Sequence, residues 1–249
     1  MIQKTFLILF ICTICIVSCF AQEDTLRVAE HPKKSFPYAF VVPSVLISYG
    51  VANRFSDDLR NIDRRIDDKI QQNIDRQYTF DDYIRYTPYL GIYALDLCGV
   101  KAKHNIVDRT LVVGSSLFFC MSSVYITKQS TGVLRPDASD NHSFPSGHTA
   151  TAFLGAHILF KEYKDVSPWI GIAGYTVAAT TGTMRLINRK HWLSDVLTGA
   201  GLGILSVELS YLMLPVWHNL FKTKFSDNNV VINPFINSDG AGVGAVWVF

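Results

Sequence analysis

One histidine in the chain stands where a backbone could hold an anion. His148 follows Pro145, Ser146 and Gly147 directly before an apolar run, in the stretch FPSGHTATAF. Pro145 suits a first helical turn, and the free N–H groups and dipole of such a turn favour phosphate or sulfate. The amides of Ser146 and Gly147 are therefore predicted to hold an oxyanion beside His148. An ordinary loop that contains a histidine would account for the same four residues.

A second histidine has a carboxylate one helical turn away. His191 and Asp195 lie four residues apart in MRLINRKHWLSD. At this spacing Asp195 can accept a hydrogen bond from one ring nitrogen and leave the other free as a nucleophile.

Three cations flank the two histidines. Lys128 and Arg135 lie upstream in KQSTGVLRP, and Arg185 precedes His191. In an up-and-down helical bundle these segment ends would meet on one face. The chemistry that this set favours is phosphoryl transfer, in which the cations hold the charged equatorial oxygens of a phosphoryl group. His191 would attack phosphorus and form a phosphohistidine, while His148 would protonate the departing oxygen and later activate water.

The elements that must position these residues are six segments largely free of charge. Their lengths predict six helices packed together in an all-α bundle. A stretch between the first two repeats apolar residues at three- and four-residue steps, which predicts an amphipathic helix that lies on a membrane surface or covers the bundle. The six segments are Phe36 to Asn53, Tyr86 to Val100, Thr110 to Thr127, Thr149 to Phe160, Val166 to Met184, and Trp192 to Trp217; the apolar residues of the amphipathic stretch are Leu59, Ile62, Ile66, Ile70 and Ile74.

Composition favours a membrane protein. Of the 249 residues 49% are hydrophobic and 18% are charged, the net charge is +2, and the mean hydropathy is +0.19. A nucleic-acid-binding protein usually presents a basic face, so that class is excluded. We expect a bundle that lies in or against a membrane.

The chain divides into four expected parts. Residues 1–21 are typical of a secretory leader, cleaved after Ala21 or, in a lipoprotein, before a lipidated Cys19; a retained first membrane helix is the alternative. Residues 22–35 are polar, residues 36–220 form the helical domain, and residues 221–249 are a tail with a predicted β-hairpin. Cys98 and Cys120 lie in apolar segments and are expected to be buried. No metal-ligand spacing of cysteine or histidine occurs, so neither a metal nor a cofactor is expected.

Three motifs resemble those of a known family. The patterns K-x6-RP from Lys128 to Pro136, PSGH from Pro145 to His148, and R-x5-H-x3-D from Arg185 to Asp195 are similar to the signature of the type 2 phosphatidic acid phosphatase superfamily. This family includes lipid phosphatases, class A acid phosphatases and vanadium haloperoxidases. The resemblance implies a metal-independent phosphatase on a helical bundle, with the catalytic roles given above. Met184 stands where the family commonly has a small residue, which puts substrate detail in doubt.

Several functions agree with these patterns. The leading hypothesis is a phosphatase of membrane lipid phosphates in a bacterial cell envelope, in the inner membrane with its site facing the periplasm. The alternatives are a soluble periplasmic acid phosphatase, a vanadate-dependent haloperoxidase and a structural membrane protein. A periplasmic site requires that one of the first three segments does not cross the membrane. The oligomeric state stays open.

Arg189 and Lys190 are expected in a solvated loop, and His142 is a weaker candidate than His148 for leaving-group protonation.

Overall fold

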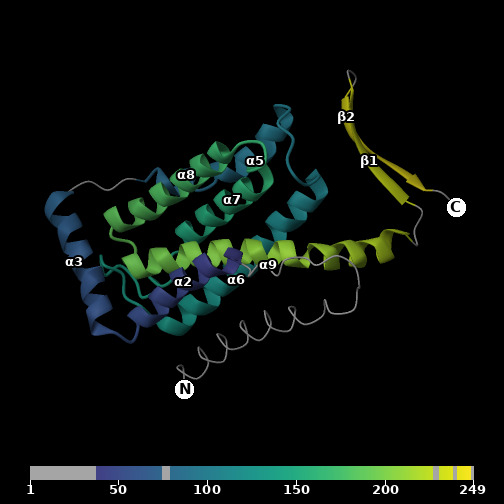
Figure 1. The fold of residues 1–249 in the computed structure, drawn as a ribbon. Coiled ribbons are helices and arrows are strands. Elements are labelled where there is room, and N and C mark those ends of the chain that lie inside the picture. Colours follow the sequence, from purple (N-terminus) through teal and green to yellow (C-terminus); the bar gives the residue numbers. More distant parts are fainter. Residues whose placement is uncertain (1–37, 75–78, 227–229, 238–239, 248–249) are drawn as a thin grey trace.

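A computed structural model describes residues 38–74, 79–226, 230–237 and 240–247 (Figure 1). The expected leader and the polar stretch 22–35 lie outside these residues. The described elements are eight helices and one antiparallel pair of strands: α2 Tyr38–Asn53, α3 Asp57–Asn73, α4 Asp81–Ile84, α5 Thr87–Leu97, α6 Ile106–Thr131, α7 Gly147–Tyr163, α8 Pro168–Ile187, α9 Leu193–Ser226, β1 Val230–Asn237 and β2 Gly240–Trp247.

The expected count of six helices is corrected to eight within the described residues. The six charge-poor segments correspond in order to α2, α5, α6, α7, α8 and α9, and the polar stretch between α2 and α5 adds α3 and the four-residue α4. The body of the structure is thus all-helical. Helix α9 continues to Ser226, beyond the expected domain boundary at residue 220, and the β1–β2 hairpin follows it in the tail.

Local signals explain where the helices near the motifs begin and end. Asn105 caps α6, because its side chain accepts a hydrogen bond from the Asp108 amide at 2.9 Å. Gly132 ends the same helix in the left-handed conformation, with φ of 58°, which glycine adopts without strain. The chain therefore turns sharply just after Lys128, into the loop that carries the first motif.

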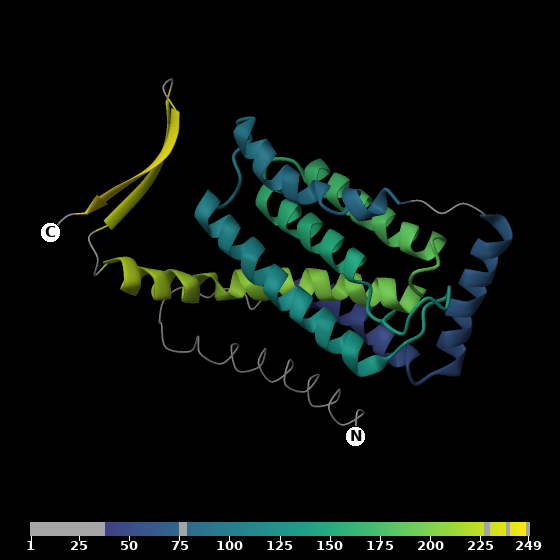
Figure 2. The same ribbon diagram turned by 180° about the vertical axis from the view of Figure 1, so that it is seen from behind.

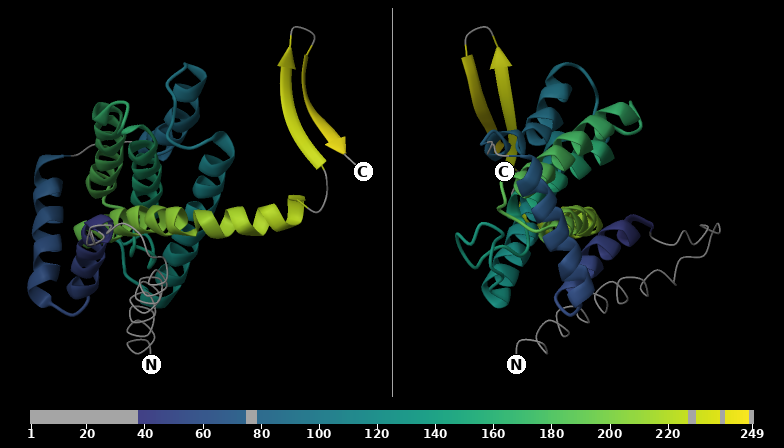
Figure 3. Two further views of the ribbon diagram at one scale, coloured as in Figure 1. Left: turned by 45° about the vertical axis from the view of Figure 1, so that its right-hand side comes forward. Right: turned by 90° about the vertical axis from the view of Figure 1, so that its left-hand side faces the viewer.

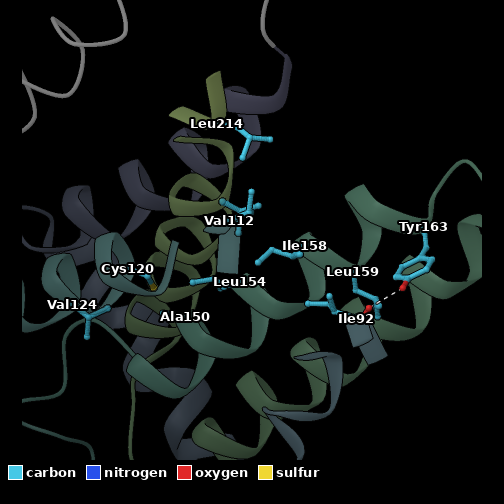
Figure 4. Packing of buried hydrophobic residues seen from close by; sticks show 11 residues of the cluster. Ile92, Val112, Cys120, Val124, Ala150, Leu154, Ile158, Leu159, Tyr163 and Leu214 are labelled. Atoms are coloured by element: carbon cyan, nitrogen blue, oxygen red, sulfur yellow. Dashed lines mark hydrogen bonds between the residues drawn. The ribbon is translucent and has the colours of Figure 1, made fainter. Parts of the chain in front are cut away.

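Helices α7 and α9 form the centre of the bundle. Helix α7 packs against α5, α6, α8 and α9, while α9 also packs against α2 and α6, which the two opposite views show (Figures 1 and 2). Side chains from α5, α6, α7 and α9 meet in one buried apolar cluster (Figure 4), which includes Ile92, Val112, Leu154, Ile158 and Val207. Burial of each such side chain contributes about 1.5–3 kcal/mol to folding.

Two glycines bring α9 into backbone contact with α7. A Cβ at Gly199 would collide with the carbonyl oxygen of Ser146, and one at Gly203 would collide with that of Ala150. Small residues at a helix crossing allow this close approach. The crossing sets the start of α7, which carries the PSGH motif, beside the start of α9, which carries Asp195.

Helix α3 stands across one end of the bundle (Figures 1 and 3). Its buried residues are Asp63 and Asp67 and its Ile62 is 40% exposed, so the structure does not confirm the predicted apolar face as its packing surface. The two carboxylates are buried because they pair with polar groups of the loop before α9 and of α9 itself.

Among the described residues, two helices are long and apolar enough to cross a membrane by length and composition. They are α6 and the part of α9 from Leu193 to Asn219. Helix α5 has 11 residues and a length of about 16 Å, well below the roughly 30 Å of a bilayer core. Cys120 is buried as expected, whereas Cys98, at the end of α5, is exposed.

Candidate active site

Asp195 is held from two sides at the start of α9. Its Oδ2 accepts hydrogen bonds from the backbone N–H of Trp192 at 2.9 Å and from the hydroxyl of Ser143 at 2.5 Å. The first contact caps α9 in the manner of an acidic residue in a first helical turn. The second joins α9 to the loop between α6 and α7. Ser143 and Asp195 are both fully buried, and sequence reasoning missed Ser143 because a single serine 52 positions away carries no pattern.

His191 lies beside Asp195, in the loop between α8 and α9, and is 4% exposed. Its Nδ1 is 3.7 Å from Asp195 Oδ2, which is longer than the predicted hydrogen bond. Nδ1 of His191 and Oδ1 of Asp195 are both buried and have no hydrogen-bond partner among the described residues.

Burial keeps His191 neutral. It lowers the pKa of His191; Asp195 opposes this shift, and the positive charges of Lys128 and Arg135 reinforce it. A neutral imidazole with an unprotonated nitrogen is the form that can attack phosphorus.

The first motif is tied to the other two through backbone carbonyls. Lys128 Nζ donates to the carbonyls of His142 at 2.5 Å and Ser143 at 3.5 Å. Arg135 Nη1 donates to the carbonyl of Lys190 at 3.3 Å, directly before His191, and its Nε pairs with Asp140 at 2.9 Å. Both predicted cations therefore lie at the same end of the bundle as His191.

The start of α7 differs from the prediction in two ways. Helix α7 begins at Gly147 with Ser146 as its cap, so Pro145 lies before the helix rather than in its first turn. The Ser146 amide donates to the carbonyl of Asp195 at 3.0 Å and is not available to an oxyanion in this structure. At Gly147 an added Cβ would meet only Val124, at an ordinary 3.6 Å.

His148 and Arg185 share a carboxylate from α4. Asp82 Oδ1 is 2.7 Å from His148 Nε2 and 3.4 Å from Arg185 Nη1. The neighbouring Asp81, which is fully buried, lies 2.8 Å from Arg185 Nε. Sequence reasoning missed both carboxylates, since two adjacent aspartates in a stretch of mixed charge are not a motif.

The charge states of this group follow from burial and from its neighbours. Burial, with Arg185 and Arg85 nearby, lowers the pKa of His148 to about 4, although Asp82 acts in the opposite direction. Burial opposes ionisation of Asp82, but the hydrogen bond from His148 and the nearby arginines together outweigh it and hold the pKa of Asp82 below the usual range. At neutral pH an ionised Asp82 therefore faces a neutral His148.

Other charged residues near the motifs form ion pairs. Arg189 and Lys190, expected in a solvated loop, pair with Asp67 and Asp137: Arg189 makes two bonds of 3.0 Å to Asp67, and Lys190 makes one of 2.6 Å. His142 is half exposed, and its ring is 4.0 Å from Asp140. Within the described ranges, no three histidine, cysteine or acidic side chains gather where they could hold a metal ion.

The three motifs meet at one end of a helical bundle, where two histidines lie beside three cations, an arrangement that can bind an anion. Comparison with known proteins agrees with this interpretation. A sequence model of the PAP2 superfamily matches residues 109–218, which contain all three motifs. Residues 109–218 of this chain are therefore similar to the PAP2 superfamily.

One curated relative and two solved structures are similar to this chain. The relative, a protein of Porphyromonas gingivalis named "Lipid A 1-phosphatase", is 56% identical over 134 residues, which are 53% of this chain but only 30% of the relative. A transmembrane PAP2-type phosphatidylglycerolphosphate phosphatase from Bacillus subtilis has a TM-score of 0.44 and 19% identity over 70% of this chain and 94% of its own. Aquifex aeolicus LpxE has a TM-score of 0.43 and 21% identity over 61% of this chain and 93% of its own.

Proposed function

We propose that the chain is a metal-independent phosphatase that hydrolyses phosphate monoesters or diphosphates of membrane lipids. Phosphatidate, phosphatidylglycerol phosphate, undecaprenyl diphosphate and lipid A are the candidate substrates. The name of the Porphyromonas gingivalis relative supports a lipid phosphate and favours lipid A within this group. The apolar helices α6 and α9 support a membrane setting.

The contact of Asp82 with His148 and Arg185 is the observation that carries this proposal. An oxygen anion already lies between these two side chains, within hydrogen-bonding distance of His148 and 3.4 Å from Arg185. Groups that hold a carboxylate oxygen in this way can hold a phosphate oxygen equally well. We infer that a phosphate oxygen of the substrate takes the place of Asp82 Oδ1.

The reaction then proceeds in two steps, formation and hydrolysis of a phosphohistidine at His191. His191 attacks phosphorus, a P–N bond forms, and the P–O bond to the lipid breaks, while Lys128, Arg135 and Arg185 neutralise the equatorial oxygens. The leaving oxygen takes a proton from His148. Water then attacks phosphorus and gives a proton back to His148, and the P–N bond breaks to release inorganic phosphate.

The protonation of His148 depends on the substrate. With its pKa at about 4, His148 is neutral at pH 7 in the structure described here. A phosphate group carries more negative charge than the Asp82 carboxylate that it displaces, so it raises the pKa of His148. Binding of the substrate thus supplies the imidazolium that the first step needs.

Phosphate release from purified protein in detergent, with a chelator present, tests this function. The panel contains the four lipid phosphates and one soluble phosphomonoester, with His191→Ala as the blank. We expect release from at least one lipid and none from His191→Ala. Turnover of the soluble ester alone would contradict a lipid phosphatase, and halide oxidation that appears only with added vanadate would favour a haloperoxidase.

Asp82→Asn tests the exchange of anions. The neutral amide competes less well than a carboxylate for Arg185, so KM should fall while the enzyme keeps its nucleophile. Asp165→Asn is a matched control, since Asp165 is exposed just after the end of α7, at the opposite end of that helix from His148. An unchanged KM for Asp82→Asn would show that substrate does not displace this carboxylate.

We also propose that the protein resides in a bacterial inner membrane with residues 1–21 as a leader, residues 36–220 as the phosphatase domain and the site facing the periplasm. Ser139 is exposed in the loop of the first motif, so a cysteine there reports the side of the membrane. In a Cys98→Ser background, Ser139→Cys should react with a membrane-impermeant maleimide in cells whose outer membrane is permeabilised. Labelling only after lysis would place the site on the cytoplasmic side.

A further inference from the structure

A cavity of about 210 Å³ adjoins the catalytic loop. It lies between the end of α2, helix α3 and the residue that follows His191. The lining residues that matter here are Asn53, Arg54, Arg60, Asp63, Arg64 and Trp192. Apart from Trp192, which occupies a variable position of the third motif, none of them lies in the three motifs, and the proposed reaction uses none of their side chains.

Three polar groups in the cavity wall have no acceptor. Nδ2 of Asn53, Nε of Arg54 and Nε of Arg60 are buried and have no hydrogen-bond partner among the described residues. Asn53 is fully buried. Other atoms of these side chains form hydrogen bonds: Arg54 Nη2 donates to Asn53 Oδ1 at 2.6 Å and to Ser194 Oγ at 3.2 Å, and Arg60 Nη2 donates to Asp57 at 2.5 Å. All three unpaired groups are donors, so the cavity lacks an acceptor.

The charge of the lining has the sign that an acceptor anion would balance. The lining contains three guanidinium groups and one carboxylate, Asp63, whose oxygens already accept from Ser194, at 2.6 Å from its hydroxyl and 3.2 Å from its amide. Asp57, outside the lining, pairs with Arg60, so one positive charge remains unbalanced among these five groups. Water could accept hydrogen bonds from the unpaired donors, but it would leave the positive charge in place. The volume is several times the roughly 30 Å³ that one water molecule occupies, so an anion with three or four oxygens fits.

We propose that this cavity is a second anion subsite, which binds a phosphate or carboxylate group through Arg54, Arg60 and Asn53. Trp192 and Ser194 link it to the loop that carries His191 and to Asp195, so its occupant lies beside the catalytic loop. If the anion is part of the substrate, the inference rests on the proposed function and means that the substrate carries an anionic group besides the phosphate that is cleaved. A free anion would instead be an effector.

Kinetics with two lipids identify an anion that belongs to the substrate. Phosphatidylglycerol phosphate carries an extra phosphodiester that phosphatidate lacks. In Arg60→Gln the ratio of KM for phosphatidylglycerol phosphate to KM for phosphatidate should rise about tenfold, which corresponds to about 1.4 kcal/mol. Arg65→Gln is the matched control, because Arg65 is exposed on the same helix and does not line the cavity. The Arg60 side chain is 43% exposed, so its replacement leaves the fold intact.

Fluorescence of Trp192 detects a free anion without catalysis. Inorganic phosphate is titrated into the full chain, and Trp192→Phe identifies the signal of this tryptophan. Phosphate at the catalytic histidines affects Arg60→Gln and Arg65→Gln alike, so the difference between these two variants reports the cavity. A response that is lost in Arg60→Gln and kept in Arg65→Gln shows that the cavity binds phosphate.

These readouts separate the outcomes. A changed KM ratio assigns the anion to the substrate, and a lost fluorescence response with an unchanged ratio assigns it to a free anion. If neither quantity distinguishes Arg60→Gln from Arg65→Gln, the subsite does not exist. A wild-type chain that hydrolyses no lipid removes the proposed function, while the fluorescence titration still decides the subsite.

Discussion

Replacement of Ser143 by alanine removes one of two hydrogen bonds that hold the carboxylate beside His191. Ser143 Oγ lies 2.5 Å from Asp195 Oδ2, and both residues are fully buried. The other oxygen of Asp195 has no hydrogen-bond partner in the described part of the chain, so only the Trp192 amide would remain. A hydrogen bond to a charged group contributes about 1.5–3 kcal/mol. If about 2 kcal/mol of this is lost in the transition state, kcat falls about 30-fold.

Steady-state phosphate release and thermal unfolding measure this effect together. We expect Ser143→Ala to lower kcat with little change in KM, because Ser143 orients Asp195 and does not contact the phosphate. Ser116→Ala is the control, since Ser116 is also fully buried but donates to a carbonyl of its own helix, that of Val112, at 2.6 Å. Ser143→Thr keeps the hydroxyl and should recover part of the rate. Equal kcat values for Ser143→Ala and Ser116→Ala would refute the reasoning.

Two further predictions concern the crossing of α7 with α9 and the charge of His148. Gly199→Ala should reduce the yield and melting temperature of folded protein, because its Cβ would collide with the Ser146 carbonyl. Gly114→Ala on α6 is the control, since an added Cβ there meets nothing within 4 Å. Equal melting temperatures of the two variants would contradict the close crossing of α7 and α9. The pKa of His148 is lowered to about 4 from its ordinary value of 6.5, so the unfolded chain binds more protons between these values. Stability should therefore fall as the pH drops from about 6.5 toward 4, by at most about 1.4 kcal/mol per pH unit. In denaturant titrations at these pH values, His148→Gln should flatten this slope. An unchanged slope would show that His148 is already protonated in the folded state.

The sequence predicted the helical segments and the end of the bundle at which the motifs meet. Long apolar runs specify helices, and helices that alternate in direction place Lys128 at the end of α6 near His148 at the start of α7. The same alternation of direction places Arg185 at the end of α8 and His191 just before α9, at this same end of the bundle. Spacing along a helix is a local property, so a single sequence contains it.

Side-chain contacts across long stretches of chain could not be predicted in this way. His148 is 66 positions from Asp82, and Arg185 is 103 positions from it. The Ser146 amide was assigned to an oxyanion, but the close crossing of α7 and α9 gives it the carbonyl of Asp195 instead. A helix start has free donors only if no neighbouring element supplies an acceptor, and that depends on the packing.

Three of the carboxylates that hold this site come from a part of the chain outside the family match. Residues 109–218 match the PAP2 superfamily, whereas Asp63, Asp67 and Asp82 lie in α3 and α4. Asp82 contacts His148 and Arg185, Asp67 holds Arg189 near His191, and Asp63 holds Ser194 beside Asp195. These three contacts reach the second and third motifs from one side of the bundle. Because the motifs supply the reacting groups and α3 and α4 set their charge and position, two proteins with identical motifs can differ in pH dependence and substrate through this segment alone.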